Sequence, residues 1–430
     1  MADPVVDPSL HEPVAERRRF ASLAPFRHPA YARLWTGAFV SNVGTWMESI
    51  ALGIYVTRET GQAAWTGTVA AAAFLPIAFF GPIGGALADR IPRKRLLMTT
   101  TFVQMLLAGM LTYLFATGSP SAPVVTLIAL GNGVCAALGF PAFQALLPDL
   151  VPVEDLPGAI ALSSAQYNLG RVVGPALAGI VIGTDRFAAA EAVNTVSFLA
   201  VIAVLLTLTL PAPSPDARTE GIWRSIGEGF RFVRHDAGLR INALAMCVNT
   251  FLAAPFIALV PAMAQTVLLH GNGSDAGGYT AVLVTAQGIG AVAMALSLGP
   301  LTHRFGPRRV LLTMMTSLPF ALALYAVAPD LAASALAILV VGALYLGALS
   351  TFTSIAQLKA PAEVRGRVLS INIMILGALY PLGAVVQGKV ADSVGLREVT
   401  FLSAALLLAV IVVTRLVRPG ITKALETPVG

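Results

Sequence analysis

Long apolar stretches, separated by short segments rich in charged residues, glycine and proline, make up most of this chain. A helix of about 20 apolar residues crosses the hydrocarbon core of a bilayer and satisfies its own backbone hydrogen bonds. The pattern therefore predicts an all-α integral membrane protein with twelve transmembrane helices. The expected spans are 35–57, 64–88, 95–117, 122–145, 158–183, 188–210, 241–269, 276–302, 308–328, 331–355, 367–391 and 398–417.

Composition agrees with this pattern and excludes an ordinary soluble domain, because 56% of the residues are hydrophobic and only 12% are charged. The net charge of +6 does not indicate nucleic-acid binding, since the cations are unevenly distributed over the two sets of predicted loops. One set holds only Arg58, Arg186, Lys389 and Arg397, and nearly all other cations belong to the opposite set. By the positive-inside rule both termini are expected to be cytoplasmic.

The two halves of the chain resemble each other, as in many secondary transporters. The second and eighth predicted helices align with Gly85 opposite Gly299 and Arg90 opposite Arg304, and the fifth and eleventh helices align more weakly. The sequence thus predicts two pseudo-symmetric six-helix bundles and a linker that ends in an amphipathic helix on the cytoplasmic leaflet. The expected parts are a cytoplasmic tail 1–34, a bundle 35–210, a linker 211–240, a bundle 241–418 and a cytoplasmic tail 419–430.

The segment "GGALADRIPRKR", between the second and third spans, completes the evidence for a family. With six plus six helices, a middle linker and an internal repeat, the chain resembles the major facilitator superfamily, whose motif in this loop has matching glycine, aspartate and basic positions. The matching residues are Gly85, Asp89, Arg90, Arg93 and Lys94. Such charges at a helix end can form a conformational latch between the two bundles; the alternative is that they only orient the chain.

This chain departs from the family's motif at one position, and its second copy of the motif differs from the first at another; both differences affect the expected latch. Pro92 replaces the usual glycine, and His303 stands in the second copy where Asp89 stands in the first. We therefore expect the first copy to dominate.

A second motif, "GRVVGPALAG", lies in the fifth span and resembles one associated with antiporters of the superfamily. Its matching residues are Gly170, Gly174, Pro175 and Gly179. The small residues permit close helix packing and the proline permits a bend. Close packing without any exchange role is the open alternative.

The opening stretch and the motif loop are similar to the branch of enterobactin-exporter-like and macrolide-efflux-like carriers. This resemblance implies proton-driven export of a medium-sized amphipathic small molecule, such as a drug, macrolide or siderophore, across a bacterial inner membrane. The alternatives are an uptake symporter or facilitator and a transport-inactive sensor or scaffold. We expect no enzyme activity, cofactor, metal site or nucleic-acid partner, and a monomer in the lipid bilayer suffices for this architecture.

Two charges lie deep in predicted spans, Glu48 in the first and Arg171 in the fifth. A charge at such depth is costly and marks a candidate functional site. In the family fold both helices line the central cavity, so we expect the two groups to face each other or the same water. Three roles remain open for Glu48: uptake and release of the coupled proton, contact with substrate, or a static ion pair with Arg171.

Polar and aromatic residues on the same predicted helices form a candidate substrate cavity. They are Asn42, Gln166, Asn168, Asn249, Gln287, Asn372 and Tyr380. Each can instead form a hydrogen bond between helices.

Overall fold

The computed structural model describes residues 21–182, 186–208, 222–270, 275–361 and 364–426. Every regular element in these ranges is a helix, as the apolar pattern predicts. The expected tail over 1–20, the linker over 211–221 and the last residues, 427–430, lie outside them.

The helices of the first part of the chain follow the predicted spans closely. They are η2 (Ala21–Arg27), α2 (Pro29–Thr60), α3 (Ala63–Phe74), α4 (Pro76–Arg90), α5 (Arg93–Thr117), α6 (Ala122–Leu150), α7 (Leu156–Ile182) and α8 (Phe187–Thr207). The helices of the second part are α9 (Ile222–His235), α10 (Ala237–Leu252), α11 (Phe256–Ala262), η3 (Met263–Leu268), α12 (Ala276–Phe305), α13 (Pro307–Val327), α14 (Leu331–Lys359), α15 (Arg365–Val394), α16 (Leu396–Val417) and η4 (Ile421–Leu425).

Several helices begin where the sequence offers a suitable cap. Asp236 and Asp330 precede α10 and α14, and each carboxylate accepts a hydrogen bond from the backbone N–H three residues later, at 2.7 and 2.8 Å respectively. Helix α2 begins at Pro29, before the predicted start at residue 35. Proline suits the first position of a helix, because the backbone N–H that it lacks would have no intrahelical partner there.

Ten helical segments in the described part of the chain are long and apolar enough to cross a membrane. Helices α2 and α7 are of similar length but are not among the ten. Helix α2 contains Glu48, and α7 contains the polar stretch that ends in Arg171. The helices that carry the two charges predicted to lie deep thus fall outside this set of ten.

Two segments are interrupted within the predicted spans. The span over 64–88 divides into α3 and α4 at Leu75, directly before Pro76, which cannot donate a backbone hydrogen bond. The span over 241–269 divides at residues 253–255, and the side-chain amide of Gln387 donates to the carbonyls of Phe251 (3.1 Å) and Leu252 (3.0 Å). A neighbouring helix therefore satisfies carbonyls freed by the break.

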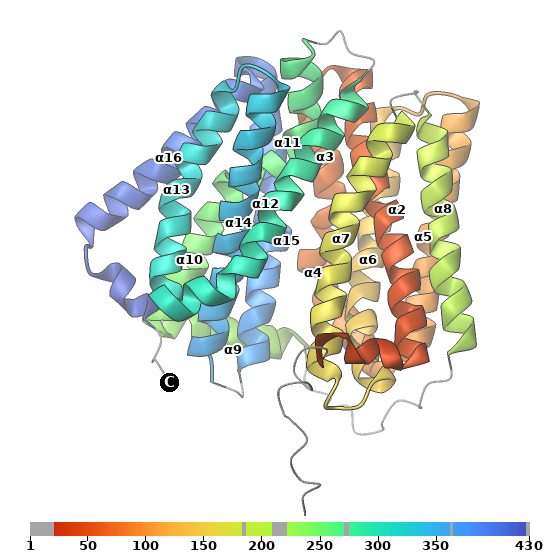
Figure 1. Cartoon of the computed structure of the whole chain (residues 1–430), viewed down its shortest axis with the longest axis horizontal. Helices are drawn as coiled ribbons and strands as arrows, with labels where there is room; N and C mark the ends of the chain where they lie inside the picture. Colours follow the sequence, from red (N-terminus) through yellow and green to blue (C-terminus); the bar gives the residue numbers. More distant parts are fainter. Residues whose placement is uncertain (1–20, 183–185, 209–221, 271–274, 362–363, 427–430) are drawn as a thin grey trace, which may run out of the picture.

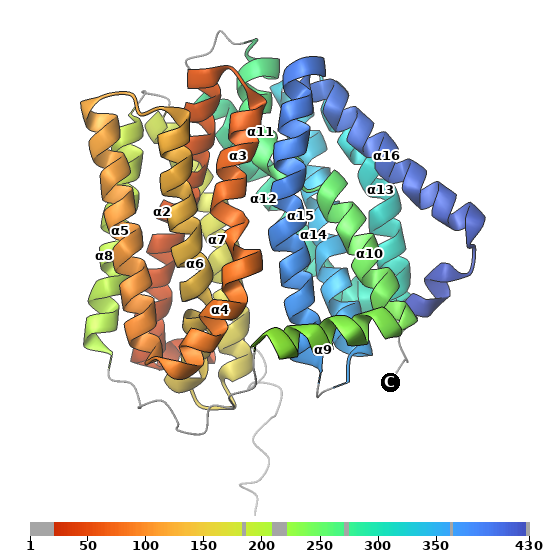
Figure 2. The same ribbon diagram turned by 180° about the vertical axis from the view of Figure 1, so that it is seen from behind.

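The helices form two groups that lie side by side, α2–α8 and α10–α16 (Figures 1 and 2). In the first group α2 packs on α7 and α8, and α6 on α4 and α5; in the second, α14 packs on α12 and α13. The main contacts between the groups are α7 with α12 and α3 with α15. Helix α9 runs across one end of the second group and packs on α15 and α10 (Figure 2).

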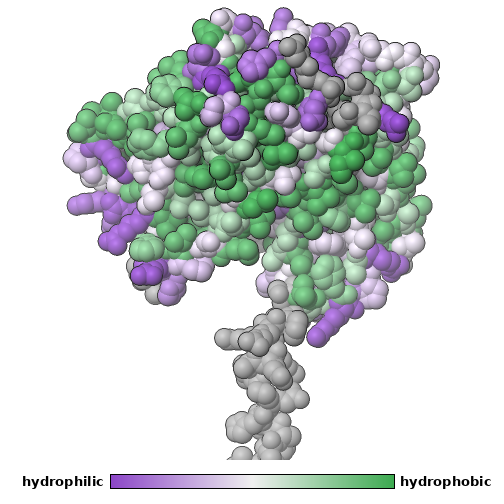
Figure 3. Space-filling model, turned by 45° about the horizontal axis from the view of Figure 1, so that its top comes forward, coloured by the Kyte–Doolittle hydropathy of each residue, from purple (hydrophilic) through white to green (hydrophobic). Residues whose placement is uncertain are grey.

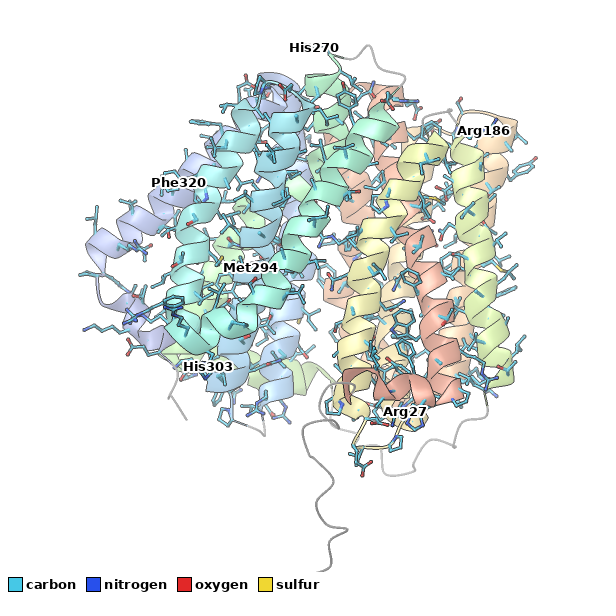
Figure 4. All side chains as sticks on the ribbon, in the orientation of Figure 1. Arg27, Arg186, His270, Met294, His303 and Phe320 are labelled. Carbon is cyan, nitrogen blue, oxygen red and sulfur yellow. The ribbon has the colours of Figure 1, made fainter. Side chains whose placement is uncertain are left out.

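We name the two ends of the molecule by this helix. Arg27 and His303 lie at the α9 end, and Arg186 and His270 lie at the opposite, far end (Figure 4). Hydrophobic residues cover much of the flank between the two ends, whereas hydrophilic ones gather toward them (Figure 3). Large apolar side chains on the long helices, such as Leu127, Leu324 and Leu336, are more than 60% exposed. This is the surface that a lipid bilayer covers.

The two groups approach each other most closely toward the far end. A Cβ atom added at Gly67 of α3 would lie 2.7 Å from the carbonyl carbon of Ala384 on α15, and one at Gly388 would lie 3.0 Å from Cα of Ala64. One turn away, the carboxylate of Asp392 on α15 accepts hydrogen bonds from the first backbone N–H groups of α3, at 2.6 and 3.2 Å. The far end is therefore closed by backbone-to-backbone packing.

At the α9 end the ribbons of the two groups separate (Figures 1 and 2). Gly85 on α4 and Gly299 on α12, the equivalent positions of the internal repeat, have no neighbouring atom within 4 Å of an added Cβ. The close backbone contacts between the two groups described here thus lie toward the far end, and the ribbons diverge toward the α9 end.

Candidate functional site

Glu48 is buried on the face of α2 that packs against α6 and α8. Its side chain is 6% exposed. One carboxylate oxygen accepts a 2.8 Å hydrogen bond from the amide of Asn132 on α6, and the other accepts from the amide of Asn194 on α8. Two neutral donors, with no cation among the described residues, therefore hold this carboxyl group.

A second carboxyl group, Glu191, shares this environment. Glu191 lies three residues before Asn194, so both side chains lie on the same face of α8. It is 0% exposed, and neither of its carboxyl oxygens has a hydrogen-bond partner. Its main electrostatic neighbour is Glu48, and the two like charges repel. We call Glu48 and Glu191 the carboxyl pair.

A glycine permits this arrangement. Gly44 lies one turn before Glu48, and a Cβ atom there would lie 2.6 Å from the amide oxygen of Asn194 and 3.0 Å from Cβ of Ser197. Any larger residue would push α8 away from α2. The close approach encloses the carboxyl pair between helices, away from the lipid-facing surface.

The carboxyl pair corrects two expectations drawn from the sequence. Glu48 was expected to be the only deeply placed acid, but Glu191 is more fully buried. Glu48 and Arg171 were expected to face each other or the same water, but no ion pair joins them, and Arg171 lies against Trp46 instead. Residues two apart on a helix point in directions about 200° apart, so Trp46 and Glu48 occupy different faces of α2.

Arg171 lies on the side of α2 that faces α7 and the second helix group. Its guanidinium carbon lies 5.6 Å from the ring centroid of Trp46, a cation–π arrangement. Tyr167, one turn before Arg171 on α7, packs edge-on against the same Trp46 ring at 5.7 Å. The sequence predicted Arg171 as a site residue but did not predict its contact with Trp46.

Two further rings extend this arrangement across the interface between the groups. Phe74 at the end of α3 lies 6.3 Å from Trp46 and 5.5 Å from Tyr380 of α15, centroid to centroid. We call Trp46, Phe74, Tyr167 and Tyr380 the aromatic cluster. Tyr380, predicted as a cavity residue, thus belongs to the surroundings of Arg171, whose charge also acts on its hydroxyl group.

The remaining predicted cavity residues divide into two kinds. Asn42 lies one turn before Trp46, and Asn168 donates to the carbonyl of Ser164 on its own helix. The others are buried polar side chains, each with at least one side-chain N or O atom that has no hydrogen-bond partner: Gln166, Asn249, Gln287 and Asn372. Unpartnered buried polar atoms are uncommon and mark positions where a ligand or water gains hydrogen bonds.

The structure divides the latch motif into anchored and free residues. Arg93 donates to the carbonyl of Ala145 and pairs with Asp149, both at 2.8 Å, and Lys94 donates to the carbonyl of Leu208 at 2.6 Å. These bonds stay within the first helix group. Asp89 and Arg90 are exposed at the end of α4 and have no hydrogen bond or ion pair to any described residue.

The antiporter-like motif lies at two different helix interfaces. Cβ atoms at Gly170 and Gly174 would lie 3.0 Å from Cβ of Asn42 and 2.7 Å from Cβ of Trp46, so both glycines let α7 pack on α2. A Cβ atom at Gly179 would lie 3.1 Å from the carbonyl oxygen of Gly277 on α12. Pro175 is buried between these contacts. The motif therefore brings α7 close to a helix of each group.

Comparisons with known proteins agree with this architecture. A family model described as "Transmembrane secretion effector" matches residues 20–427. The multidrug efflux pump Tap of Mycolicibacterium fortuitum is 27% identical, with 86% of this chain and 90% of that protein covered. Macrolide efflux protein A of Streptococcus pyogenes is 25% identical (88% and 94% covered), and the enterobactin exporter EntS of Escherichia coli is 25% identical (79% and 80% covered).

Solved transporters share the fold. The nucleoside transporter NupG has a TM-score of 0.69 at 14% identity, with 89% of this chain and 98% of that chain covered. A bacterial homolog of the human lysosomal transporter Spinster, in an inward-facing and occupied conformation, has a TM-score of 0.70 at 14% identity, with 94% and 99% covered. At these identities the likeness concerns the fold alone.

Proposed function

Because this chain belongs to the transmembrane secretion effector family of the major facilitator superfamily, a family of membrane transporters and not of enzymes, we propose that it exports a medium-sized amphipathic compound in exchange for protons. Support for export comes from the three relatives, all of which are named as efflux proteins. We do not assign the substrate class of any of these relatives to this chain, because identities of 25–27% do not fix a binding site.

The proposed topology has twelve spans in two six-helix bundles. It adds α2 and α7 to the ten apolar segments, since both run alongside spans of the same bundle and pack on each other. The α9 end is the cytoplasmic end in this proposal, because the basic motif over 90–95 lies there. Both termini are then cytoplasmic and the structure corresponds to an inward-open state.

The carboxyl pair is the proposed proton site. Two buried carboxyl groups that repel each other, with no cation bonded to Glu48 among the described residues, can share a proton that the transport cycle takes up and releases. Asn132 and Asn194 donate to the two oxygens of Glu48, whereas no described residue donates to Glu191, and the titration belongs to the pair as a unit. Exchange requires a route for protons to the carboxyl pair from each side of the membrane in turn.

Substrate passes between the two bundles by alternating access. In this conformation the far end is sealed by α3 on α15 and α7 on α12, whereas Asp89 and Arg90 are free. In the opposite conformation the α9 end closes, and the two free charges become available to pair with the other bundle. The contacts that close one end exist in only one of the two conformations. Each conformation is therefore stabilised by its own set of contacts, as a two-state transporter requires.

The carboxyl pair is the observation on which proton coupling depends, and everted membrane vesicles test it. With a proton gradient imposed, erythromycin, 2,3-dihydroxybenzoate, fluorescein and ethidium are added in turn and the proton gradient is monitored. At least one compound is expected to discharge the gradient through the native protein and not through Glu48→Gln. Equal discharge through both proteins would remove Glu48 from coupling.

A further inference from the structure

Arg171 is a cation at the middle of a helix, and no described residue forms an ion pair with it. It is half-buried, and its guanidinium carbon lies 5.6 Å from the ring centroid of Trp46. Of the carboxyl pair, Glu48 lies on another face of α2 and is held by two asparagines, and Glu191 lies on α8. Charged side chains at this depth are normally paired with each other or with a ligand.

The side chain of Arg171 is oriented for recognition of a planar anion. A guanidinium presents five N–H donors in a rigid fork that matches a carboxylate or a phenolate, and a cation–π contact with the Trp46 ring uses none of these donors as a conventional hydrogen bond. No carboxylate or carbonyl oxygen in the described part of the chain accepts a hydrogen bond from them. Those donors remain available to a ligand.

The aromatic cluster supplies an apolar surface beside this cation. Tyr167 and Trp46 belong to the first bundle and Tyr380 to the second, and Phe74 contacts both Trp46 and Tyr380. Tyr167 is 41% exposed even though it packs against Trp46, so its ring still presents open area. Aromatic rings stack with each other in offset or edge-on arrangements, and a planar ligand would use the same geometry.

We propose that Arg171 and the aromatic cluster bind an aromatic anion, the guanidinium taking its carboxylate or phenolate and the rings its planar body. The inference rests on the proposed export function and narrows its substrate class, because an unpaired cation repels the cationic amphipathic compounds that many multidrug pumps carry. A membrane potential that is negative inside also drives an anion outward. The site joins both bundles, so a ligand there contacts the two parts that move.

Fluorescein and rhodamine 6G provide a matched pair of probes. Both contain the same xanthene ring system, but fluorescein is anionic and rhodamine 6G is cationic near neutral pH. Binding to the purified protein in detergent is measured by fluorescence anisotropy. The native protein is expected to bind fluorescein about 10- to 100-fold more tightly than rhodamine 6G, the ratio that a charge-assisted hydrogen-bonded pair supplies.

Three variants separate charge from structure. Arg171→Gln is expected to lose the preference for fluorescein, Arg171→Glu to reverse it in favour of rhodamine 6G, and Arg171→Lys to keep part of it, since lysine keeps the charge but not the fork. Reversal by Arg171→Glu is a gain of binding that a misfolded protein cannot show. Absence of fluorescein binding to the native protein, equal binding of the two probes, or a preference for rhodamine 6G would overturn the proposal.

The same probes distinguish failure of this inference from failure of the proposed function. Fluorescein that binds with the expected preference but is not accumulated by energised everted vesicles supports the site and contradicts export. Accumulation of rhodamine 6G but not of fluorescein supports export and contradicts the site. Each result therefore decides one of the two claims.

Discussion

Replacing Gly67 by alanine should shift the protein toward the conformation that is open at the far end. In the present conformation the new methyl group would lie 2.7 Å from the carbonyl carbon of Ala384 and closer still to its oxygen. Both atoms belong to the backbone of α15, which cannot move without displacing the whole helix. The clash exists only while α3 and α15 are in contact, so opening of the far end relieves it.

The magnitude follows from the cost of overpacking. Inserting one methyl group into a well-packed contact costs about 1–3 kcal/mol. Because about 1.4 kcal/mol corresponds to a factor of ten, the ratio of far-end-open to far-end-closed molecules should rise about 5- to 150-fold. Gly81 is the matched control: it lies in α4, in the same predicted span, and an added Cβ atom there has no neighbour within 4 Å.

Distances between spin labels measure this shift. One pair, at Glu59 on α2 and Ser393 on α15, reports on the far end, and a second pair, at Arg95 on α5 and Arg304 on α12, reports on the α9 end. In Gly67→Ala the first distance should lengthen and the second shorten, whereas Gly81→Ala should match the native protein. Identical distance distributions in both variants would refute the reasoning from backbone contact.

Further predictions concern the proton site, the far-end contact and the latch. Glu48→Gln and Glu191→Gln should each abolish gradient-driven transport while retaining binding of substrate to purified protein, since the two carboxyls act as a unit; transport rates and equilibrium binding check this, and gradient-driven transport by either variant would contradict it. Asp392→Asn removes the charge from two hydrogen bonds to the start of α3, one of them exposed. It should favour the far-end-open conformation by about 1 kcal/mol, roughly fivefold, in the same spin-label measurement. An unchanged distance distribution would show that this contact does not affect the equilibrium between the two conformations. Asp89→Asn should leave the thermal stability of the present conformation unchanged, because Asp89 has no partner there, but should slow transport several-fold; a lowered melting temperature would contradict the view that it acts only in the opposite state.

Much of the fold could be predicted because it depends on local, one-dimensional signals. The apolar runs gave the helices, and prolines gave some of their starts and interruptions, as at Pro29 and Pro76. The interruption between α10 and α11 could not be predicted in the same way, because it is stabilised by Gln387, which lies far away in the sequence. The described part of the predicted linker contains α9, and an ion pair between Glu228 of this helix and Arg367 of α15 at 2.7 Å is a detail that the sequence pattern could not supply.

The site was predictable residue by residue but not as an arrangement. Glu48 and Arg171 were recognisable because each is an isolated charge within an apolar run. Glu191 was missed because it lies in the second turn of its helix, near a predicted loop, where an acid is usually solvated and favoured by the helix dipole. Only the packing of α8 on α2, through Gly44, shows that it is buried. The separation of Glu48 from Arg171 likewise depends on helix rotation, which sequence spacing alone does not give.

The central claim is that transport is coupled to protons through the carboxyl pair. Purified native protein in liposomes, with whichever of the four vesicle compounds is transported present at equal concentration on both sides, tests it most directly. With the membrane potential held at zero, a one-for-one exchange of compound and proton should accumulate the compound about tenfold on the more acidic side at a gradient of about one pH unit, and reversing the gradient should reverse the direction of net flux. The Glu48→Gln protein should show no net flux in either case. Net flux that is indifferent to the pH gradient in the native protein, or gradient-driven accumulation by the Glu48→Gln protein, would contradict the account.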